Sequence, residues 1–370
     1  MLKILFVIGT RPEAIKMAPL IQRFYKEKDF VVKVCNTGQH KDLLDPIINF
    51  FQLSIDYNLQ LMMPNQGLHE LTAAIILHLK PVLEKEKPDY VFVHGDTTTS
   101  FAASLAAFYS GIKIAHVEAG LRTFNKKAPF PEEINRSLTA RMANIHFAPT
   151  QTAKDNLLSE GIREPIEVTG NTVIDALLDA TQLIDENSIE IQHLKQVIDI
   201  NKRIILFTGH RRENFGEGFE EIFAALLEIT KNRDDLQVVY PVHPNPNVKL
   251  VAEKYFGNSD TIKLIPPLSY GPFTWLMQKS YIVLTDSGGI QEEAPSLGKP
   301  VLVLREVTER PEAVNAGTVF IVGTNQATII SLANRLLDDN DFYLQISQAI
   351  NPYGDGKASD RIVEYVKIQL

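Results

Sequence analysis

The chain lacks most features of secreted and membrane proteins. It has a single cysteine, Cys35, inside an apolar run that is typical of a strand. One thiol can form neither an internal disulfide nor a cysteine-rich metal site, so we expect a buried, inert cysteine. No stretch approaches the roughly 20 apolar residues of a membrane span, and the apolar start, residues 1–8, is too short for a signal peptide. We therefore expect a cytoplasmic protein.

An excess of positive charge is also missing. The 370 residues include 37 Lys and Arg against 45 Asp and Glu, which gives a net charge of −8. This balance makes a general role in binding nucleic acid or anionic membrane improbable. The hydrophobic share of 45% and the charged share of 22% are typical of a soluble globular protein. The length suits about two domains.

Several cofactor motifs are absent. The first turn, Gly9–Glu13, lacks the Gly-x-Gly-x-x-Gly of a dinucleotide site, which counts against a dehydrogenase. No Gly-x-x-x-x-Gly-Lys-Ser/Thr loop occurs. His69-Glu70 is followed by Ala73 where a zinc protease needs its second histidine. No cofactor and no metal are predicted.

Short β-rich runs alternate with amphipathic helical segments along the whole chain, which predicts parallel, doubly wound sheets. The pattern restarts after a polar, helix-prone segment, so we expect one domain at 1–169 plus about 355–370, and a second at 170–354. Strands are predicted at Lys3–Ile8, Val31–Asn36, Tyr90–His94, Ile112–Val117, Ile145–Ala148, Ile166–Thr169, Arg203–Thr208, Gln237–Pro241, Ile262–Ile265, Tyr281–Leu284, Val301–Leu304 and Val319–Val322. Helices are predicted at Pro12–Glu27, Leu68–Lys85, Thr97–Tyr109, Glu132–Ala143, Thr150–Ser159 and Ala358–Leu370.

One strand–turn–helix segment has the form of an anion site. The run Tyr281–Leu284 is followed by Ser287, Gly288 and Gly289 and by a helix that Gly298 should end. The glycines let a ligand approach the backbone, and the N–H groups at a helix start favour a phosphate. Ser287 can cap the helix or donate to a phosphate oxygen. A well-capped turn without a ligand would give the same pattern.

Charged residues near this turn favour a nucleotide. Glu292 and Glu293 come about one helical turn later, where a carboxylate can accept both hydroxyls of a ribose. Arg305 and Arg310 follow the next strand, and parallel strands bring their carboxyl ends to one edge of the sheet. We therefore expect a nucleotide at that edge.

Three carboxylates, Asp96, Glu118 and Glu132, are predicted to meet at the carboxyl edge of the first sheet. Asp96 before three threonines would also suit a helix N-cap, and Glu132 at a helix start would suit the helix dipole. Glu118 directly follows an apolar strand, where a carboxylate needs a partner. Crowded carboxylates repel, so we expect at least one pKa to rise towards neutrality. Acid–base chemistry accounts for all three together.

Cationic side chains are expected at the same edge. Arg11 and Lys16 follow the first strand, and Arg136 lies on the helix that begins near Glu132. In the second half, His210 sits in a basic loop and can titrate near neutral pH, so ligand contact is expected. His243 either lines the same site or belongs to a surface loop.

An ordered set of motifs resembles the bacterial non-hydrolysing UDP-N-acetylglucosamine 2-epimerases, from Gly9 to the last turns of the chain. The motifs are Gly9–Lys16, His94–Thr97, His116–Arg122, Pro131–Glu133, Gly209–Asn214, Asp286–Glu293 and residues 308–313. The resemblance implies an α/β, GT-B-like fold: two Rossmann-like, doubly wound domains with a deep interdomain cleft, assembled as a homodimer. It implies reversible interconversion of UDP-GlcNAc and UDP-ManNAc by elimination of UDP and re-addition, which supplies sugars for surface polysaccharides.

The resemblance also implies roles for individual residues. The acid–base residues would be Asp96, Glu118 and Glu132, with His210 serving the leaving diphosphate. Substrate-binding residues would be Arg11, Lys16, Arg136, Leu268, Phe273, Ser287, Gly288, Gly289, Glu293 and Arg310. Residues for a second, activating UDP-GlcNAc would be Gln39, Gln66, Arg211 and His243. Asn65 stands where some allosteric relatives have Arg, and Leu268 where some have Gln.

Four other functions fit parts of this pattern. A GT-B glycosyltransferase would share the nucleotide-sugar site. A hydrolysing epimerase would release free ManNAc. An epimerase of a modified UDP-HexNAc, such as a diacetamido uronic acid, would share the fold. A non-catalytic sensor of UDP-sugars would not need three convergent carboxylates.

Overall fold

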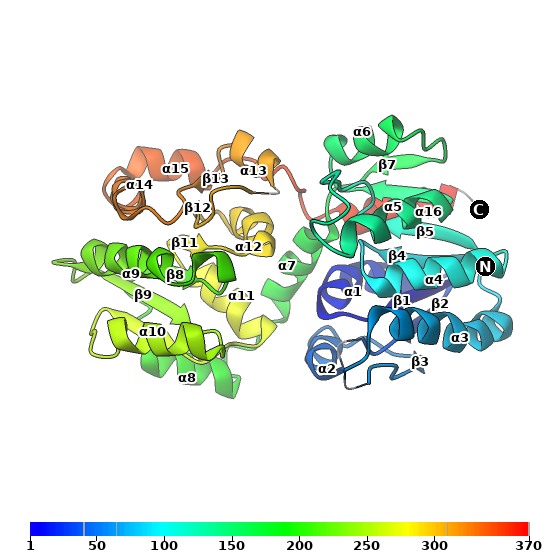
Figure 1. Cartoon of the computed structure of the whole chain (residues 1–370), viewed down its shortest axis with the longest axis horizontal. Helices are drawn as coiled ribbons and strands as arrows, with labels where there is room; N and C mark the ends of the chain where they lie inside the picture. The colour runs from blue at the N-terminus through cyan, green and yellow to red at the C-terminus, as the bar shows by residue number, and fades with distance from the viewer. Residues whose placement is uncertain (40, 64, 309, 369–370) are drawn as a thin grey trace. The chain divides into compact units, whose positions relative to one another are not determined.

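A computed structural model describes residues 1–39, 41–63, 65–308 and 310–368. The chain divides into two compact units, and each is described by itself. Unit 1 comprises Met1–Asp179 and Tyr353–Leu370, and unit 2 comprises Ala180–Pro352. Both are layered α/β units built on a parallel sheet (Figure 1).

Over its described residues, unit 1 has a seven-stranded sheet in the order β3-β2-β1-β4-β5-β6-β7. All strand pairs in it are parallel, as the alternation of strands and helices predicts. The strands are β1 (Leu2–Ile8), β2 (Phe30–Asn36), β3 (Tyr57–Asn58), β4 (Tyr90–His94), β5 (Lys113–Val117), β6 (Ile145–Ala148) and β7 (Ile166–Val168). The order reverses direction between β1 and β4, and loops at that point of a doubly wound sheet form its binding edge.

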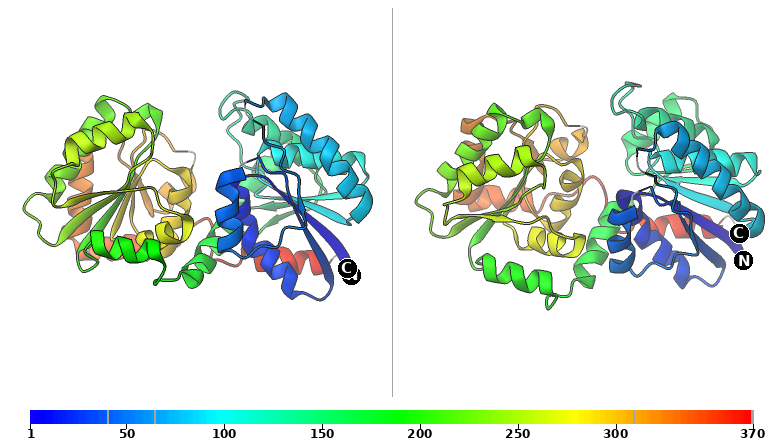
Figure 2. Two further views of the ribbon diagram at one scale, coloured as in Figure 1. Left: turned by 90° about the horizontal axis from the view of Figure 1, so that it is seen from below. Right: turned by 60° about the horizontal axis from the view of Figure 1, so that its bottom comes forward.

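Helices cover both faces of this sheet. Its helices are α1 (Arg11–Lys26), α2 (Lys41–Phe50), α3 (Leu68–Glu86), α4 (Thr98–Tyr109), α5 (Glu132–Met142), α6 (Gln151–Ser159), α7 (Thr172–Leu183, which continues into unit 2) and α16 (Ala358–Ile368). Helix α4 packs against α3 and α5, and α1 packs against α2 and α16. Figure 2 shows α1 and the red α16 together on one face, with the cyan α3 and α4 on the other. Aromatic side chains pack where α1 meets the sheet: Phe24 of α1 contacts Phe6 of β1 and Phe92 of β4, and the ring centroids of Phe6 and Phe92 are 5.0 Å apart.

In the described part of unit 2, six strands form a second parallel sheet, in the order β10-β9-β8-β11-β12-β13. They are β8 (Arg203–Thr208), β9 (Leu236–Pro241), β10 (Ile262–Ile265), β11 (Ile282–Thr285), β12 (Val301–Val303) and β13 (Val319–Ile321). The helices are α8 (Ile189–Val197), α9 (Glu217–Thr230), α10 (Pro246–Phe256), α11 (Tyr270–Lys279), α12 (Gly288–Glu293), α13 (Pro311–Asn315), α14 (Gln326–Asp338) and α15 (Asn340–Ser347), with the 3-10 turns η1 (Arg212–Asn214) and η2 (Ala294–Leu297). The apolar sides of α9, α10 and α14 form one core with the strands.

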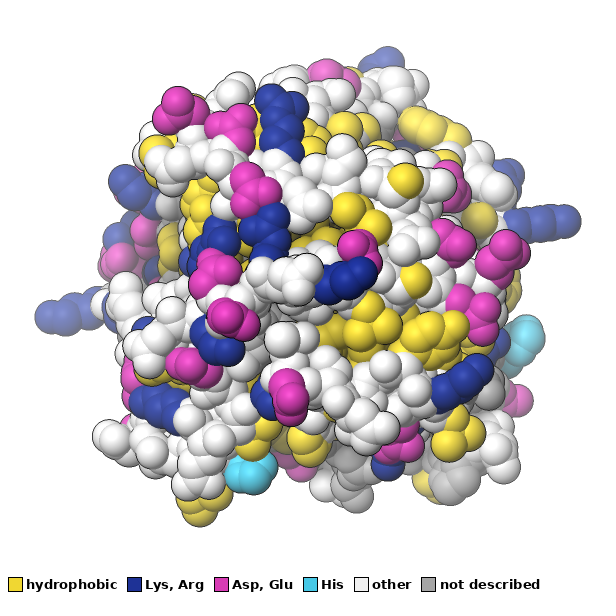
Figure 3. All heavy atoms as spheres, turned by 90° about the vertical axis from the view of Figure 1, so that its left-hand side faces the viewer, with side chains coloured by type: hydrophobic (Ala, Val, Ile, Leu, Met, Phe, Trp, Pro, Cys, Tyr) yellow, Lys and Arg dark blue, Asp and Glu magenta, His cyan; other side chains and the backbone are white. Residues whose placement is uncertain are grey.

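One face of unit 2 mixes charges of both signs with small apolar areas (Figure 3). No basic stripe of the kind that tracks a nucleic-acid backbone stands out on that face. Separately, none of the described helices is both long and apolar enough to cross a membrane.

The structure differs from the sequence-based expectation in three features, namely helix α2, strand β3 and the boundary between the units. Helix α2 and the short edge strand β3 were not predicted, because Pro46 interrupts the helical pattern and two residues are too few to give a strand pattern. The units also divide within α7 rather than at Gly170. The start of α7 stays with unit 1 because the buried Asp175 carboxylate accepts the backbone N–H groups of Ala358 and Ser359, at 3.2 and 2.7 Å.

Candidate active site

The loop after β1 is anchored by Glu13, a carboxylate of α1 that is only 1% exposed. It accepts the backbone N–H groups of Gly9 and Thr10, at 3.0 and 2.7 Å. It also accepts the hydroxyls of Thr97 and Ser100 on the β4–α4 turn, at 2.6 and 3.0 Å. Burial raises the pKa of this carboxyl group, while those donors lower it. Glu13 therefore fixes the first turns of α1 and α4 relative to each other, a role that the sequence did not reveal.

Glu118 stands at the carboxyl end of β5 in a left-handed backbone conformation, with φ of 59°. Its Oε2 is paired with the Lys16 ammonium and accepts Asn171 Nδ2 at 2.8 Å. The imidazole Nε2 of His94 lies 3.9 Å from the same oxygen. Burial by itself would raise the pKa of Glu118, but Lys16, His94 and Asn171 outweigh it and lower that pKa to about 2. The sequence-based expectation that Glu118 needs a partner is confirmed.

Asp96, one residue after the β4 end, is paired with Arg136 of α5. Asn135 Nδ2 donates to the Asp96 backbone carbonyl at 3.0 Å. Burial raises the pKa of Asp96, Arg136 opposes that shift, and the Glu118 charge adds to it. The neighbouring carboxylates therefore shift in opposite directions, and the expected rise falls on Asp96. The alternative of an Asp96 helix cap is wrong, because Thr97 caps α4 and accepts Ser100 N–H at 3.0 Å.

The adjacent acids Glu132 and Glu133 of α5 differ in their surroundings. Glu133 accepts the backbone N–H groups of Thr123 and Phe124, at 3.0 and 2.8 Å, and so holds the preceding loop. Glu132 Oε2 is buried and has no hydrogen-bond partner among the described residues. Glu132 and Arg136 are four residues apart, so both project from the same side of α5. We call Asp96, Glu118 and Glu132 the carboxylate cluster: Glu118 acts on the pKa of Asp96, and Glu132 is included because it shares a side of α5 with Arg136, the partner of Asp96.

The expected cations of unit 1 do not all belong to this cluster. Lys16 and Arg136 do, through the pairs just described. Arg11, at the first position of α1, is partly exposed and has no ion pair with a described residue. Arg122 points elsewhere, since its guanidinium binds both oxygens of Glu160, at 2.7 and 2.9 Å.

In unit 2, a buried aspartate positions the histidine loop. Asp286 Oδ2 accepts the backbone N–H groups of His210 and Arg211, both at 2.8 Å, and Oδ1 lies 3.1 Å from His210 Nδ1. Burial raises the pKa of Asp286, but the His210 contacts and the Arg211 N–H outweigh it, and the net shift is downward. The His210 side chain is 44% exposed, and the ring of His243 stacks on its ring with the two centroids 5.6 Å apart.

The turn Asp286–Gly289, which we call the phosphate turn, connects β11 to α12. Ser287 occupies the N-cap position, but its hydroxyl makes no capping bond, so of its two predicted roles the cap is wrong and the phosphate contact stays a prediction. Instead the turn is held by Thr285 Oγ1, which accepts Ser287 N–H at 3.0 Å. The Ser287 hydroxyl is therefore not committed to the helix. A side chain added at Gly289 would meet no atom within 4 Å.

Arg310 lies beside the phosphate turn. Its Nε donates to Glu292 at 2.5 Å, and a Cβ added at Gly288 would be 3.5 Å from Arg310 Nη2. Glu292 is buried and paired with Arg310, whereas Glu293 is partly exposed and stays the predicted ribose contact. Glu309, in the same motif, lies outside the described residues.

The remaining predicted residues are distributed over both units. Phe273, on α11, and Leu268, before it, are partly buried. Gln39 accepts the Thr99 hydroxyl at 2.8 Å, and Gln66 Oε1 accepts Met63 N–H at 3.2 Å. Arg211 Nε donates to the Asp286 carbonyl at 3.1 Å.

Sequence reasoning missed the residues that hold others in place: Glu13, Glu133, Asn171 and Asp286. Glu13, Glu133 and Asp286 stood inside recognised motifs, but nothing in a single sequence separates a ligand-facing acid from its neighbour. Asn171 does have a signal, because it follows a strand at the same sheet edge as Glu118.

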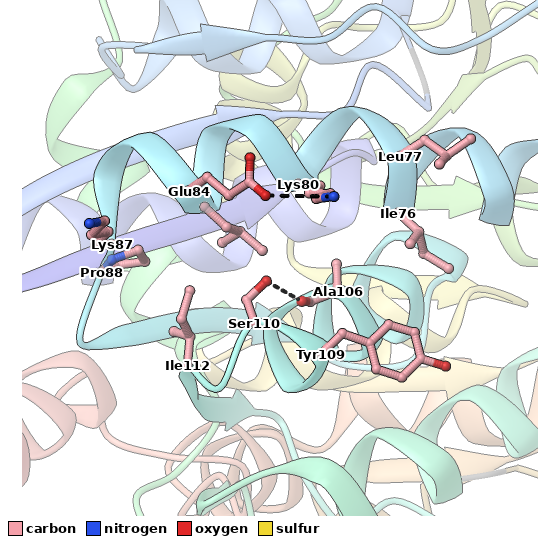
Figure 4. A pocket seen from close by; sticks show the side chains of 11 residues that line it. Ile76, Leu77, Lys80, Glu84, Lys87, Pro88, Ala106, Tyr109, Ser110 and Ile112 are labelled. Atoms are coloured by element: carbon pink, nitrogen blue, oxygen red, sulfur yellow. Dashed lines mark hydrogen bonds and ion pairs between the residues drawn. The ribbon is translucent and has the colours of Figure 1, made fainter.

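No group of three or more potential metal ligands occurs in the described ranges. A surface groove of about 690 Å³ lies between the C-terminal halves of α3 and α4 (Figure 4). Its charged residues are Lys80, Glu84 and Lys87, and Lys80 pairs with Glu84 at 3.6 Å. The groove contains no residue of the carboxylate cluster, so it is not a candidate for the chemistry.

Comparison with known proteins identifies the family of this chain. The family model described as UDP-N-acetylglucosamine 2-epimerase matches residues 22–367. The UDP-N-acetylglucosamine 2-epimerase of Escherichia coli K12 is 53% identical over 370 residues, which cover 99% of this chain and 98% of the relative. The Campylobacter jejuni enzyme of the same name is 53% identical over 368 residues, which cover 98% and 96%.

Solved structures match over the same extent. The UDP-GlcNAc 2-epimerase of Neisseria meningitidis, bound to UDP-GlcNAc, has a TM-score of 0.88 and 50% identity, covering 99% of this chain and 100% of that one. The Methanocaldococcus jannaschii enzyme, in complex with UDP-GlcNAc and UDP, has a TM-score of 0.79 and 35% identity, covering 99% and 100%. The expected fold class, two Rossmann-like, doubly wound domains of GT-B-like type, is confirmed. The chain belongs to the family of UDP-N-acetylglucosamine 2-epimerases, which are isomerases.

Proposed function

We propose that this protein interconverts UDP-GlcNAc and UDP-ManNAc by eliminating UDP and adding it back. The observation that carries the proposal is the carboxylate cluster, in which one buried acid is kept ionised and its neighbour has a raised pKa. Such a pair supplies a base and an acid from the same sheet edge. Family membership and the UDP-GlcNAc bound to the Neisseria meningitidis relative support the same substrate.

In the first step, a carboxylate of the cluster removes the proton from C2 of the sugar. The C1–O bond breaks, its electron pair leaves with the diphosphate of UDP, and a double bond forms between C1 and C2. The products are UDP and 2-acetamidoglucal. Glu118 suits the base, since it is ionised, and Lys16 can hold it in place. Direct deprotonation without a leaving group would be harder, because the C2 proton is weakly acidic.

In the second step, the sugar presents its other face. An acid protonates C2 while a diphosphate oxygen of UDP attacks C1, so the C1–O bond re-forms with inverted configuration at C2. Asp96 or Glu132 would supply this proton, and the raised pKa of Asp96 favours a protonated carboxyl there. Arg11 and Arg136 would contact the sugar-phosphate end.

Unit 2 would hold the nucleotide. The backbone of Ser287, Gly288 and Gly289 would bind the diphosphate, together with Arg310. Glu293 would accept the ribose hydroxyls, Phe273 would stack on the uracil, and Leu268 would contribute backbone contacts. His210, oriented by Asp286, would stabilise the charge that develops on the departing diphosphate.

Three further properties complete the proposal. The product would supply ManNAc-type sugars to surface polysaccharide synthesis in the cytoplasm. The enzyme would act as a homodimer. A second UDP-GlcNAc would activate it through Gln39, Gln66, Arg211 and His243. Saturation curves with UDP-ManNAc, measured with and without added UDP-GlcNAc, test the activation.

Incubation with UDP-GlcNAc in D₂O tests the central proposal. Deuterium should appear at C2 of both UDP-GlcNAc and UDP-ManNAc, with the Glu118→Gln variant as the control without exchange. Turnover without exchange at C2 would instead identify a glycosyltransferase, and accumulating free ManNAc a hydrolysing enzyme. Exchange only in a diacetamido uronic acid derivative would identify the modified UDP-HexNAc as the substrate.

A further inference from the structure

Asn171 stands where the chain leaves the sheet of unit 1. It follows β7 and Gly170 and directly precedes α7, and it is 3% exposed. Its backbone N–H donates to the Tyr353 carbonyl at 2.7 Å, so the outgoing chain is tied to the chain that returns to unit 1. The backbones meet closely here, because a Cβ on Gly170 would lie 3.5 Å from Gly354 Cα.

Both polar ends of the Asn171 side chain are committed. Its Oδ1 accepts Val173 N–H at 3.0 Å, which caps the first turn of α7. Because that end must be the oxygen, the other end must be the amide nitrogen, and it donates to Glu118 Oε2 at 2.8 Å. The orientation of the amide is thus fixed by the backbone donor.

We propose that Asn171 is a positioning residue that holds the Glu118 carboxylate for proton abstraction. The inference rests on the proposed function of Glu118. Lys16 attracts Glu118 as a point charge on a flexible stem, whereas Asn171 adds a directed hydrogen bond from a side chain fixed by helix α7. Together they leave Glu118 Oε1 as the oxygen without a described partner, which is the oxygen available to take a proton.

Other groups also act on Glu118. Lys16 from α1, His94 from the end of β4 and Asp96 from the loop after it all carry or can carry charge near this carboxylate. Asn171, unlike these three residues, is uncharged at every pH. Replacing it with another uncharged residue therefore removes the hydrogen bond to Glu118 without changing the net charge. The Asn171 bond also lowers the pKa of Glu118, so its loss should raise that pKa.

The test uses Asn171→Ser in the full-length protein. Serine keeps the cap of α7, since its hydroxyl can accept Val173 N–H, but it cannot reach Glu118. We expect kcat for epimerisation to fall about tenfold, the value of roughly one hydrogen bond to a charged group, with KM changed much less. The acid limb of the kcat profile should move to higher pH, because Glu118 must be ionised to act as the base. Asn171→Asp, which keeps the shape and the cap but replaces the donor with an acid, should move it further.

Asn325→Ser is the matched control. Asn325 caps α14 in unit 2 by accepting Thr328 N–H at 2.9 Å, so the same substitution is made at a helix cap remote from Glu118 in the sequence. This variant should retain the kcat and pH profile of the unmodified protein. The inference is overturned if Asn171→Ser leaves the acid limb in place, or if its loss of kcat is matched by Asn325→Ser.

A readout without turnover separates this inference from the proposed function. The pKa of Glu118 can be measured by carbon-13 NMR of labelled glutamate, with Glu118→Gln used to assign its signal. An upward shift in Asn171→Ser supports the inference even if the unmodified protein fails to epimerise UDP-GlcNAc. An unchanged pKa overturns it even if epimerase activity is demonstrated.

Discussion

The two units position their proposed ligand-binding groups in different ways. Unit 1 uses side-chain charges, and its Glu118 and Lys16 form a pair with side chains only 9% and 14% exposed. In unit 2 the proposed contacts are the backbone N–H groups of the phosphate turn and the exposed side chain of His210. The buried Asp286 holds the His210 loop in place. Charges that must exchange protons gain from a dry setting, which shifts their pKa values apart. A diphosphate, by contrast, exchanges no proton with the protein, so accessible backbone N–H groups and cations are enough to bind it.

The largest effect is expected when the proposed base of unit 1, Glu118, is replaced by a neutral residue. Glu118→Gln should lower kcat by about 10²–10⁴-fold, the usual value of general acid–base catalysis, and leave UDP affinity nearly unchanged. Coupled assays and calorimetric titration with UDP measure the two effects. Glu84→Gln, in an exposed pair with Lys80, is the control and should change neither. Near-normal turnover in Glu118→Gln would remove Glu118 from the chemistry.

The contrast also predicts that unit 1 is the more acid-labile. Burial lowers the pKa of His94, His116 and His146 to about 4, 3 and 4, from an ordinary value of 6.5. Between the lowered pKa values and 6.5, these histidines bind more protons in the unfolded chain than in the folded one. The free energy of unfolding is therefore highest above pH 6.5 and falls as the pH drops below that value. We expect a loss on the order of a few kcal/mol by about pH 4. The histidines that the structure describes in unit 2 lie at exposed positions, so we expect a smaller loss there, although burial also lowers the pKa of His243.

Hydrogen exchange of peptides from each unit, compared at neutral and mildly acid pH after correction for the intrinsic rate, locates the loss. A substitution of His146 tests the prediction at a single residue, because neither of its ring nitrogens has a hydrogen-bond partner among the described residues. His146→Leu should flatten the acid dependence of unit 1, while His78→Gln, at an exposed position, should not. Equal acid sensitivity of the two units would contradict the prediction.

The smallest expected effect concerns the phosphate turn. Gly288→Ala should leave the melting temperature unchanged, because the new Cβ would be 3.5 Å from its nearest neighbour, an ordinary contact. UDP affinity should fall about tenfold, since the methyl group keeps a phosphate from the backbone at the cost of roughly one hydrogen bond. Calorimetric titration measures the affinity, with Gly218→Ala on α9 as the control. An unchanged affinity would mean that the diphosphate does not approach this backbone.

Much of the fold and part of the site followed from local sequence. The buried strands β4 and β11 were predicted within one residue, because an apolar run bounded by polar turns leaves few alternatives. Helix α2 was missed because a proline inside it breaks the local pattern. The Glu118–Lys16 pair joins residues 102 positions apart, so the sequence predicted that both lie at one edge of the sheet but not that they pair.

The sequence by itself determined the parallel α/β architecture, the motifs at the strand ends and hence the family, since each depends on residues close together in the chain. Only the tertiary structure decided how each acid is held. Glu13 and Glu133 accept backbone N–H groups and Glu292 pairs with Arg310 through one oxygen, whereas Glu118 and Glu132 each have one oxygen with no hydrogen-bond partner among the described residues. The physical reason is that a carboxylate's role depends on its desolvation and on its donors, and long-range packing brings those donors to it.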